Sequence, residues 1–362
     1  MRILQIAHCY YPPFLDCARQ YAKLFEGTEH KVLTVYLTGE PNDDVARASS
    51  SDEVIFLNYK SKEVRGLKLG AIRRIREIVS KEDFLFCITH RSKPTYIALL
   101  ATKLPVISVH HNYGDFNRFS RRILVNLFQS RLLLLGVSNS VRDEMRRFLP
   151  HWPKDRIETL YNRIDIKATQ DVFVSKKQAR EYLGIPQNCW VVGNVGRLHH
   201  DKDQATLIRG FKIALPKLPK NSLLVIMGAG PLESELNMLT QTLSLESHVK
   251  FTGNIPDGKK YFKAFDMFAL TSDHEPFGMV LLEAMAAGLP IVCSNSGGGA
   301  EVIERVGELF ELGNAERLGE ALFRVAREQP NLDKMKKKLE SQFSDEAAQK
   351  LFLTLSFIKQ YI

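Results

Sequence analysis

The sequence predicts an α/β protein made of two Rossmann-like, doubly wound domains that face each other across a cleft. Apolar, strand-like runs alternate with helix-like segments, as in RILQIAHC followed by CARQYAKLFE. The alternation loosens around residues 150–180 and restarts at CWVVGNVGRL. A chain of 362 residues is also longer than one ordinary core accommodates. Strands that are apolar along their length are typical of parallel sheets covered by helices on both faces.

The first domain is predicted over residues 1–168. Its expected strands are RILQIAHC, HKVLTVYL, DEVIFLNY, DFLFCITH, PVISVHH and LLLLGVS. Its expected helices are CARQYAKLFE, the segment Lys60–Lys81, PTYIALLATKL, RRILVNLFQS and SVRDEMRRFLP. Helices between consecutive parallel strands are what a doubly wound domain requires.

The second domain is predicted over residues 169–339. Strands are expected in CWVVGNVGRL, SLLVIMGAG, HVKFTGN and PIVCSNSGG, with helices in DQATLIRGFKIAL, PLESELNMLTQTL and the run after Glu275. The tail from about Glu316 is predicted to be helical, and its last part, 340–362, can pack back on the first domain. Ligands of such domains bind at the carboxyl ends of the strands.

Composition limits the function classes. The chain carries a net charge of +9, which suits anionic ligands, but it has no zinc-finger spacing, RNP aromatics or KH loop, so nucleic acid is not an expected partner. No apolar run approaches a membrane span, and the N-terminus lacks a signal-peptide pattern, which together predict a cytoplasmic protein. The five scattered cysteines are expected to be free thiols.

Two basic, partly apolar segments stand out in the first domain, Lys60–Lys81 and Phe116–Phe128. One interpretation is a pair of core-facing helices with solvated basic faces. The other is docking on an anionic membrane surface, which basic amphipathic helices favour. The sequence leaves both interpretations open.

The stretch SDHEPFGMVLLEAMAAGLPIV is the most informative part of the second domain. Proline is favoured at the first helical position, so Pro276 predicts a helix start with Glu275 at its cap. The exposed amides of such an end attract phosphate, and Gly278 allows a ligand close to the backbone. Glu283, inside an apolar run, requires a polar partner, either a ligand hydroxyl or a salt bridge.

These residues resemble a known family. EPFGMVLLE is similar to the paired-glutamate signature of retaining glycosyltransferases of family 4, also called group 1, which have the GT-B fold. VGNVGRLHHDKD, VIMGAGPLESEL, VKFTGNIPD, SNSGGGAEVI and LYNRIDI resemble further motifs of that family, in the family's order. The first domain resembles the family in outline only. It lacks the usual glycine pair after YYPP, which leaves acceptor recognition at that loop open.

The resemblance implies roles for individual residues. Arg197 and Lys202 would clamp the donor diphosphate, Glu275 would contact the transferred sugar, and Glu283 would accept the ribose hydroxyls. Other expected donor contacts are Gly196, Ile255, Asp257, Phe277, Gly278, Met279, Val280, Gly297 and Gly298. Either His110 or His111 would orient the donor sugar, because alternation along the strand turns only one of them to the cleft. Acceptor contacts are expected among Asp16, Arg19, Asn112 and Asp115.

The predicted function is retaining transfer of a sugar from a nucleotide sugar, with UDP favoured over GDP and with no cofactor or metal. The predicted acceptor is a glycan or lipid-linked glycan of bacterial surface polysaccharide or lipopolysaccharide assembly. A peripheral position on the inner face of the inner membrane would accompany such an acceptor. The alternatives are a nucleotide-sugar epimerase, a phosphorylase-like enzyme of the same fold, and a non-catalytic glycan-binding protein.

Overall fold

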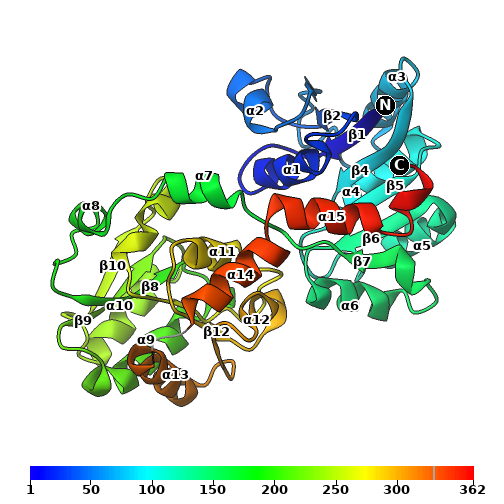
Figure 1. Ribbon diagram of the computed structural model, residues 1–362. Coiled ribbons are helices and arrows are strands. Elements are labelled where there is room, and N and C mark those ends of the chain that lie inside the picture. Colours follow the sequence, from blue (N-terminus) through cyan, green and yellow to red (C-terminus); the bar gives the residue numbers. More distant parts are fainter. Residues whose placement is uncertain (329–330) are drawn as a thin grey trace. The chain divides into compact units, whose positions relative to one another are not determined.

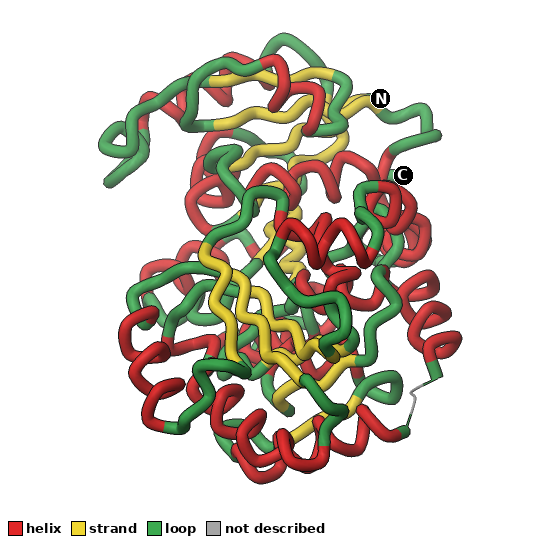
Figure 2. Tube along the Cα trace, turned by 90° about the vertical axis from the view of Figure 1, so that its left-hand side faces the viewer, coloured by secondary structure: helices red, strands yellow, loops and turns green. Residues whose placement is uncertain are grey.

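The computed structural model describes residues 1–328 and 331–362 and divides the chain into two units (Figure 1). Unit 1 contains Met1–Arg163 and Asp345–Ile362, and unit 2 contains Ile164–Ser344. The sequence placed the divisions at 168/169 and 339/340. Within each unit the strands run side by side with helices outside them (Figure 2).

Unit 1 is built on a seven-stranded parallel sheet in the order β3-β2-β1-β4-β5-β6-β7. Its strands are β1 (Arg2–Ala7), β2 (Lys31–Tyr36), β3 (Glu53–Phe56), β4 (Phe84–His90), β5 (Val106–His110), β6 (Leu132–Gly136) and β7 (Ile157–Thr159). The chain winds outward from β1 to β3, crosses back to β4, and then winds the other way. The predicted doubly wound topology is confirmed, and its switch point lies between β1 and β4.

The helices of unit 1 lie between these strands and at the C-terminus. They are α1 (Phe14–Ala22), α2 (Asp43–Ala48), α3 (Leu69–Val79), α4 (Ser92–Ala101), α5 (Phe119–Leu127), α6 (Asn139–Phe148) and α15 (Asp345–Thr354). The predicted helix over Lys60–Lys81 is wrong in its first third, because α3 begins only at Leu69. Gly66 and Lys68 take left-handed conformations, with φ of 56° and 55°, which a right-handed helix does not accommodate.

Three apolar side chains on α5 are exposed to solvent, whereas Val125 on the same helix is buried. Phe119, Ile123 and Leu127 recur every fourth residue, and 68%, 44% and 73% of their surfaces are exposed. Residues four apart form one stripe along a helix. Leu67 and Leu69, just before α3, are also exposed. The interpretation of α5 as a core-facing helix with a solvated basic face therefore does not describe its apolar stripe.

Unit 2 contains a six-stranded parallel sheet in the order β10-β9-β8-β11-β12-β13. Its strands are β8 (Trp190–Val195), β9 (Ser222–Met227), β10 (Val249–Gly253), β11 (Met267–Leu270), β12 (Ile291–Ser294) and β13 (Glu308–Phe310). Its helices are α7 (Ile166–Asp171), α8 (Lys176–Tyr182), α9 (Gln204–Ala214), α10 (Glu233–Thr242), α11 (Met279–Ala286), α12 (Gly297–Ile303), α13 (Ala315–Arg327) and α14 (Leu332–Gln342). The strand order reverses between β8 and β11, where ligands of such sheets bind.

The C-terminal segment returns to unit 1 and is held there by a buried arginine. Arg163 is fully buried, donates to an Asp345 carboxylate oxygen over 2.9 Å, and also donates to the Gln20 carbonyl. The ring of Phe352 on α15 packs edge-on against Phe25, 5.8 Å between centroids. Burial of the guanidinium lowers the pKa of Arg163, which indicates that this contact is made in a water-poor interior.

No helix among residues 1–328 and 331–362 is long and apolar enough to cross a membrane. All five cysteines are free thiols, as expected from their scattered positions.

Candidate active site

A cavity of about 630 Å³ lies at the carboxyl ends of the strands in unit 2. Residues at or just after the ends of β8, β9 and β10 line it, together with Glu283 of α11. Of the residues expected to contact a donor, Gly196, Arg197, Ile255, Asp257 and Glu283 line this cavity. Sequence reasoning missed other lining residues, which are Val195, Met227, Gly228, Ala229, Asn254, Gly258 and Lys259. The MGAG run was the available signal for Met227–Ala229.

A glycine lets the segments that follow β8 and β9 approach each other closely beside the cavity. A Cβ atom at Gly228 would lie 2.0 Å from the Gly196 carbonyl oxygen, and Gly228 has φ of 146°. Its N–H donates to the Gly253 carbonyl over 2.9 Å, which joins the loop after β9 to the last residue of β10. Only glycine fits at this position, so the segments after β8 and β9 can meet beside the cavity.

Lys202 and Glu275 form an ion pair beside the cavity, although they are 73 residues apart. The Lys202 Nζ lies 2.6 Å from Glu275 Oε2, and both side chains are largely buried. A Cβ at Gly196 would lie 3.8 Å from the Lys202 stem, so the pair adjoins the cavity wall. The Thr271 hydroxyl donates to the Lys202 carbonyl over 2.8 Å, which fixes the loop after β8 against the end of β11.

Arg197 extends into the cavity with 73% of its side chain exposed. Its nearest carboxylate is that of Asp201, at 3.7 Å from Nη2, and Asp201 also accepts from His199 over 2.5 Å. A guanidinium held at an open cavity by one long contact can turn toward an anionic ligand.

The helix start predicted at Pro276 is wrong. Helix α11 begins at Met279, and Gly278, with φ of 92°, is its N-cap. The Glu275 carbonyl accepts from the Gly298 N–H over 2.8 Å, so it does not close a first helical turn. Glu275 and Pro276 therefore belong to the loop before α11, and only Glu283 lies on the helix.

The glycines at the start of α12 lie against this loop and do not line the cavity. A Cβ at Gly298 would lie 2.2 Å from the Pro276 carbonyl oxygen. Phe277 is buried and packs edge-on against Phe343, 5.7 Å between centroids. Gly297 is the first residue of α12, and Gly278, Met279 and Val280 form the start of α11, all outside the cavity lining. Their contact with a diphosphate stays a prediction.

In unit 1, His110 ends strand β5 and is almost fully buried. Its Nδ1 lies 2.7 Å from Asp115 Oδ2, and its Nε2 lies 3.0 Å from the Ser108 hydroxyl. Asp115 also accepts from Arg121 over 2.9 Å. Burial acts to raise the pKa of Asp115, but the hydrogen bond and charge of His110 and the charge of Arg121 outweigh it, so the pKa is lowered. Asp115 is thus held ionised.

His111 lies in a different, enclosed cluster. Its ring stacks on that of His90, 5.4 Å between centroids, with its Nε2 3.1 Å from His90 Nδ1. Its Nδ1 lies 3.5 Å from the Cys17 sulfur. Burial lowers the pKa of both histidines, so both are neutral at physiological pH. Which of His110 and His111 meets a donor sugar stays a prediction.

The other proposed acceptor residues make contacts within unit 1. Arg19 lies 2.9 Å from Asp16 on α1 and 3.8 Å from Asp345. Asn112 is exposed. With its amide turned, its nitrogen donates to the His111 carbonyl and its oxygen accepts from Arg91. These contacts neither require nor prevent an acceptor, so the assignments stay predictions.

Two family models match the chain and together cover most of it. Residues 15–168 match the model described as Glycosyltransferase Family 4, and residues 175–342 match Glycosyl transferases group 1. The chain belongs to glycosyltransferase family 4, group 1. The resemblance inferred from the motifs around Glu275 is thereby confirmed.

Similar proteins place this family member among GT-B proteins. A crystal structure of Anabaena Alr3699/HepE in complex with UDP and glucose superposes with a TM-score of 0.78 at 20% identity, covering 97% of this chain and 98% of that chain. At this identity the likeness shows the fold, which is the GT-B fold predicted.

Two curated relatives are similar in sequence. The N-acetylgalactosamine-N,N'-diacetylbacillosaminyl-diphospho-undecaprenol 4-alpha-N-acetylgalactosaminyltransferase of Campylobacter jejuni is 29% identical over 64% of each chain. The lipopolysaccharide core biosynthesis glycosyltransferase LpsD of Rhizobium meliloti is 31% identical over 49% of this chain and 52% of its own. The family member spans about half to two thirds of the curated relatives that it matches.

Within residues 1–328 and 331–362 of this family member, no three His, Cys, Asp or Glu side chains gather where they could hold a metal ion. That the reaction needs no metal stays a prediction.

Proposed function

We propose that the protein transfers a sugar from a nucleoside diphosphate sugar, with UDP favoured, to a hydroxyl of a glycan or lipid-linked acceptor. The observation that carries the proposal is the unit 2 cavity, whose lining combines the glycines Gly196, Gly228 and Gly258 with Arg197 and Glu283. Exposed backbone groups and a cation suit a diphosphate, and a carboxylate suits ribose hydroxyls. The volume of about 630 Å³ is typical of a small-molecule site.

The proposed chemistry breaks the bond between the sugar and the diphosphate. Negative charge develops on the leaving phosphate oxygen, and Arg197 and Lys202 would stabilise it as fixed cations. Glu275, paired with Lys202 at 2.6 Å, would contact the transferred sugar. The acceptor proton would pass to the leaving phosphate oxygen on the same face, which gives retention without a metal.

The acceptor class rests on the relatives and on unit 1. The names of the relatives from Campylobacter jejuni and Rhizobium meliloti give a diphospho-undecaprenol-linked acceptor and lipopolysaccharide core assembly. The exposed apolar stripe of α5, flanked by arginines, suits an anionic membrane surface. We therefore propose assembly of a bacterial surface glycan, by an enzyme bound peripherally to the inner face of the inner membrane.

The rival functions differ in their products. An epimerase would convert the nucleotide sugar without acceptor, a phosphorylase-like enzyme would pass the sugar to phosphate, and a binding protein would release no nucleoside diphosphate. The ion pair of Lys202 with Glu275 beside the cavity favours transfer over binding alone.

A transfer assay tests the proposal. UDP-glucose, UDP-galactose, UDP-N-acetylgalactosamine and the GDP analogues are each incubated with lipid-linked and free oligosaccharide acceptors. The expected result is acceptor-dependent release of UDP, unaffected by EDTA, and an α-linked product by NMR. Release that is equal with and without acceptor, or that depends on added phosphate, would favour a rival function.

A further inference from the structure

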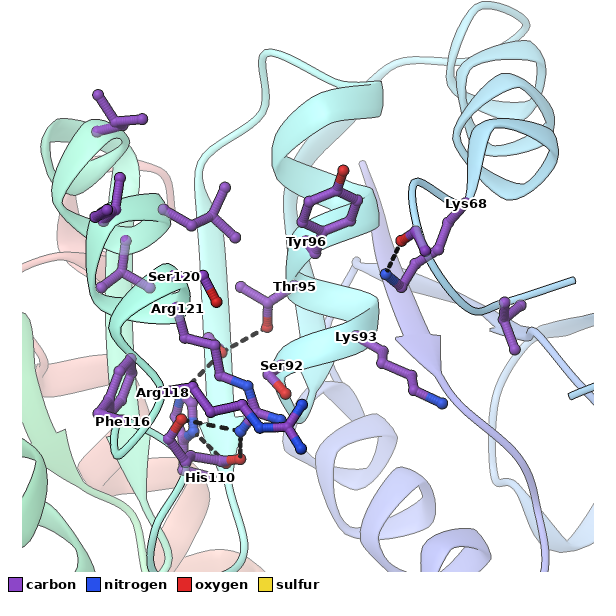
Figure 3. A pocket seen from close by; sticks show the side chains of 18 of the residues that line it. Lys68, Ser92, Lys93, Thr95, Tyr96, His110, Phe116, Arg118, Ser120 and Arg121 are labelled. Carbon is purple, nitrogen blue, oxygen red and sulfur yellow. Dashed lines mark hydrogen bonds and ion pairs between the residues drawn. The ribbon is translucent and has the colours of Figure 1, made fainter. Parts of the chain in front are cut away.

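A second cavity, of about 510 Å³, lies in unit 1 among the loop before α3, helix α4 and helix α5 (Figure 3). It reaches inward to His110 and Asp115 at the end of β5. Its volume lies within the range of typical small-molecule binding sites. A ligand in this cavity would therefore lie beside the histidine that is one of the two candidates for orienting the donor sugar.

The cavity has a strong excess of positive charge. Its five cationic side chains are Arg65, Lys68, Lys93, Arg118 and Arg121, and its acidic side chain is Asp115. Asp115 is already paired with Arg121 and His110. In the described part of the chain, no carboxylate lies within ion-pair distance of the other four cations. Unpaired cations around a cavity favour an anionic ligand.

The cations gather from separate segments. Arg118 and Arg121 converge near Ser92, the first residue of α4, whose N-terminal end carries a positive partial charge (Figure 3). Lys68 lies 4.4 Å from the centre of the Tyr96 ring on the next part of the wall. Burial, and then the positive charge of Lys93, lower the pKa of Lys68, which indicates that these ammonium groups repel each other. An anion between them would relieve the repulsion.

Much of the remaining wall is apolar, and part of it is exposed at the surface. Val64, Tyr96, Ile123, Leu124 and Leu127 line it, and Ile123 and Leu127 continue into the exposed stripe of α5. A free sugar phosphate could bond to the hydroxyl groups of Ser92, Thr95, Ser108 and Ser120, but it would leave these apolar side chains exposed to water. An apolar chain would instead cover them and gain roughly 0.8 kcal/mol per buried methylene.

We propose that this cavity binds a phosphate or diphosphate ester of an apolar chain. The phosphate would lie between Arg118, Arg121 and the start of α4, and the chain would follow Ile123 and Leu127 outward. As the acceptor of the proposed transfer, such a ligand would be a glycan joined to a lipid through this phosphate, and a glycan hydroxyl would accept the sugar; this identification rests on the proposed function, whereas binding itself does not. The same chemistry is present in the head group of a bilayer phospholipid.

Calorimetric titration of the full chain tests the proposal with soluble probes. Decyl phosphate is compared with methyl phosphate, which lacks the chain, and with decyl maltoside, which lacks the charge. Decyl phosphate is expected to bind at least about tenfold more tightly than either. Equal affinity for decyl phosphate and decyl maltoside would overturn the proposal.

Matched variants locate the site. Arg118→Ser is expected to weaken decyl phosphate binding at least about tenfold, since it removes charge-assisted hydrogen bonds. Arg147→Ser removes the same charge from an exposed residue on α6 and is expected to leave binding unchanged.

A second pair of variants tests the apolar chain. Leu127→Ser should weaken the binding of decyl phosphate but not that of methyl phosphate, with Leu100→Ser as its control. Because these side chains are exposed, the melting temperatures should stay close to wild type. Equal effects of Arg118→Ser and Arg147→Ser would overturn the proposal.

Vesicles separate the two sources of the phosphate. Sedimentation with phosphatidylcholine vesicles, with and without phosphatidylglycerol, is compared with the decyl phosphate titration. Binding of soluble decyl phosphate that depends on Arg118 supports a single-molecule site. Binding to anionic vesicles alone would mean adsorption by surface charge and would overturn it. UDP binding is measured separately. If the protein binds UDP but not decyl phosphate, only this inference is wrong. If it binds decyl phosphate but not UDP, the proposed function is wrong and the proposal for this cavity is still supported.

Discussion

The cavities of units 1 and 2 are built from different parts of the chain. The unit 2 cavity is lined by residues near three strand ends, where Gly228 allows contact with Gly196, and it carries both acids and cations. The unit 1 cavity is lined by residues from four separate segments and has five cations, one acid and a partly apolar wall. The first suits a small polar ligand read by backbone groups, and the second suits a charged amphiphile.

This difference explains why only one site is visible in the sequence. Close backbone approach requires glycine at fixed positions, so the unit 2 site leaves motifs such as VIMGAG and VGRL. Lysines, arginines and leucines at 64–68, 92–96 and 118–127 need no particular spacing to meet in space. A side-chain site of this kind appears in the sequence only as excess charge.

The largest effect is expected from Glu275→Gln in unit 2. The amide keeps the shape but loses the charge that pairs with Lys202 and would contact the sugar, so turnover should fall by roughly 100- to 1000-fold. UDP affinity should change little, because Glu275 does not line the cavity. Initial rates and UDP titrations measure both, with Glu235→Gln, an exposed residue of α10, as control. Unchanged turnover would remove Glu275 from the mechanism.

The two units also differ in continuity, because unit 1 needs the returning C-terminal segment and unit 2 does not. Arg163→Met removes the buried guanidinium that holds Asp345 and should lower the free energy of unfolding by about 3 kcal/mol. Arg19→Met, at a more exposed ion pair with Asp16, should cost less than about 1 kcal/mol. Urea denaturation followed by fluorescence measures both, and equal losses would show that the burial of Arg163 is not what matters.

Gly298→Ala tests whether the glycines of unit 2 shape the site. The added methyl group would lie 2.2 Å from the Pro276 carbonyl oxygen, so the loop that carries Glu275 must shift. We expect a loss of about 2 kcal/mol in stability together with reduced turnover. Gly70→Ala, where the methyl would lie 3.7 Å from the Tyr59 hydroxyl, is the control in unit 1. A variant with wild-type stability and turnover would show that this close approach is not required.

The buried histidines are expected to make the stability of unit 1 depend on pH, with a smaller effect than the substitutions above. Burial lowers the pKa of His90 from 6.5 to about 3, so the folded state stays neutral while the unfolded state takes up a proton. Stability should therefore fall as the pH drops below 6.5, by up to about 1.4 kcal/mol per pH unit from this residue. His90→Gln should reduce that slope, and His151→Gln, at an exposed position, serves as control. Urea denaturation at several pH values between about 3 and 6.5 measures how the free energy of unfolding changes with pH. An identical change with pH in wild type and His90→Gln would contradict the account.

Much of the fold could be predicted from the sequence, because buried parallel strands are continuous apolar runs. The runs RILQIAHC and PVISVHH became β1 and β5 with few differences at their ends. The start of α3 could not be predicted, since left-handed Lys68 has no signal of its own in an apolar periodicity. The start of α11 was misjudged because Pro276 fits a helix start, whereas the tertiary hydrogen bond from Gly298 sets the loop.

Part of the candidate site in unit 2 could also be predicted from the sequence. Motif order brought Gly196, Arg197, Ile255 and Glu283 to one cavity. The pairing of Lys202 with Glu275 could not be derived from spacing, because it depends on how the loops after β8 and β11 meet. The support that Gly298 gives to Pro276 likewise appears only when α12 is placed.

The most direct test of the account is a calorimetric titration of UDP and 2′-deoxy-UDP into wild type, Glu283→Gln and the control Glu235→Gln. If the unit 2 cavity holds the nucleotide with Glu283 on the ribose hydroxyls, wild type and Glu235→Gln should prefer UDP. Glu283→Gln should bind UDP about tenfold more weakly and lose most of that preference. UDP binding by Glu283→Gln with wild-type affinity and preference, or no binding of UDP by wild type, would contradict the account.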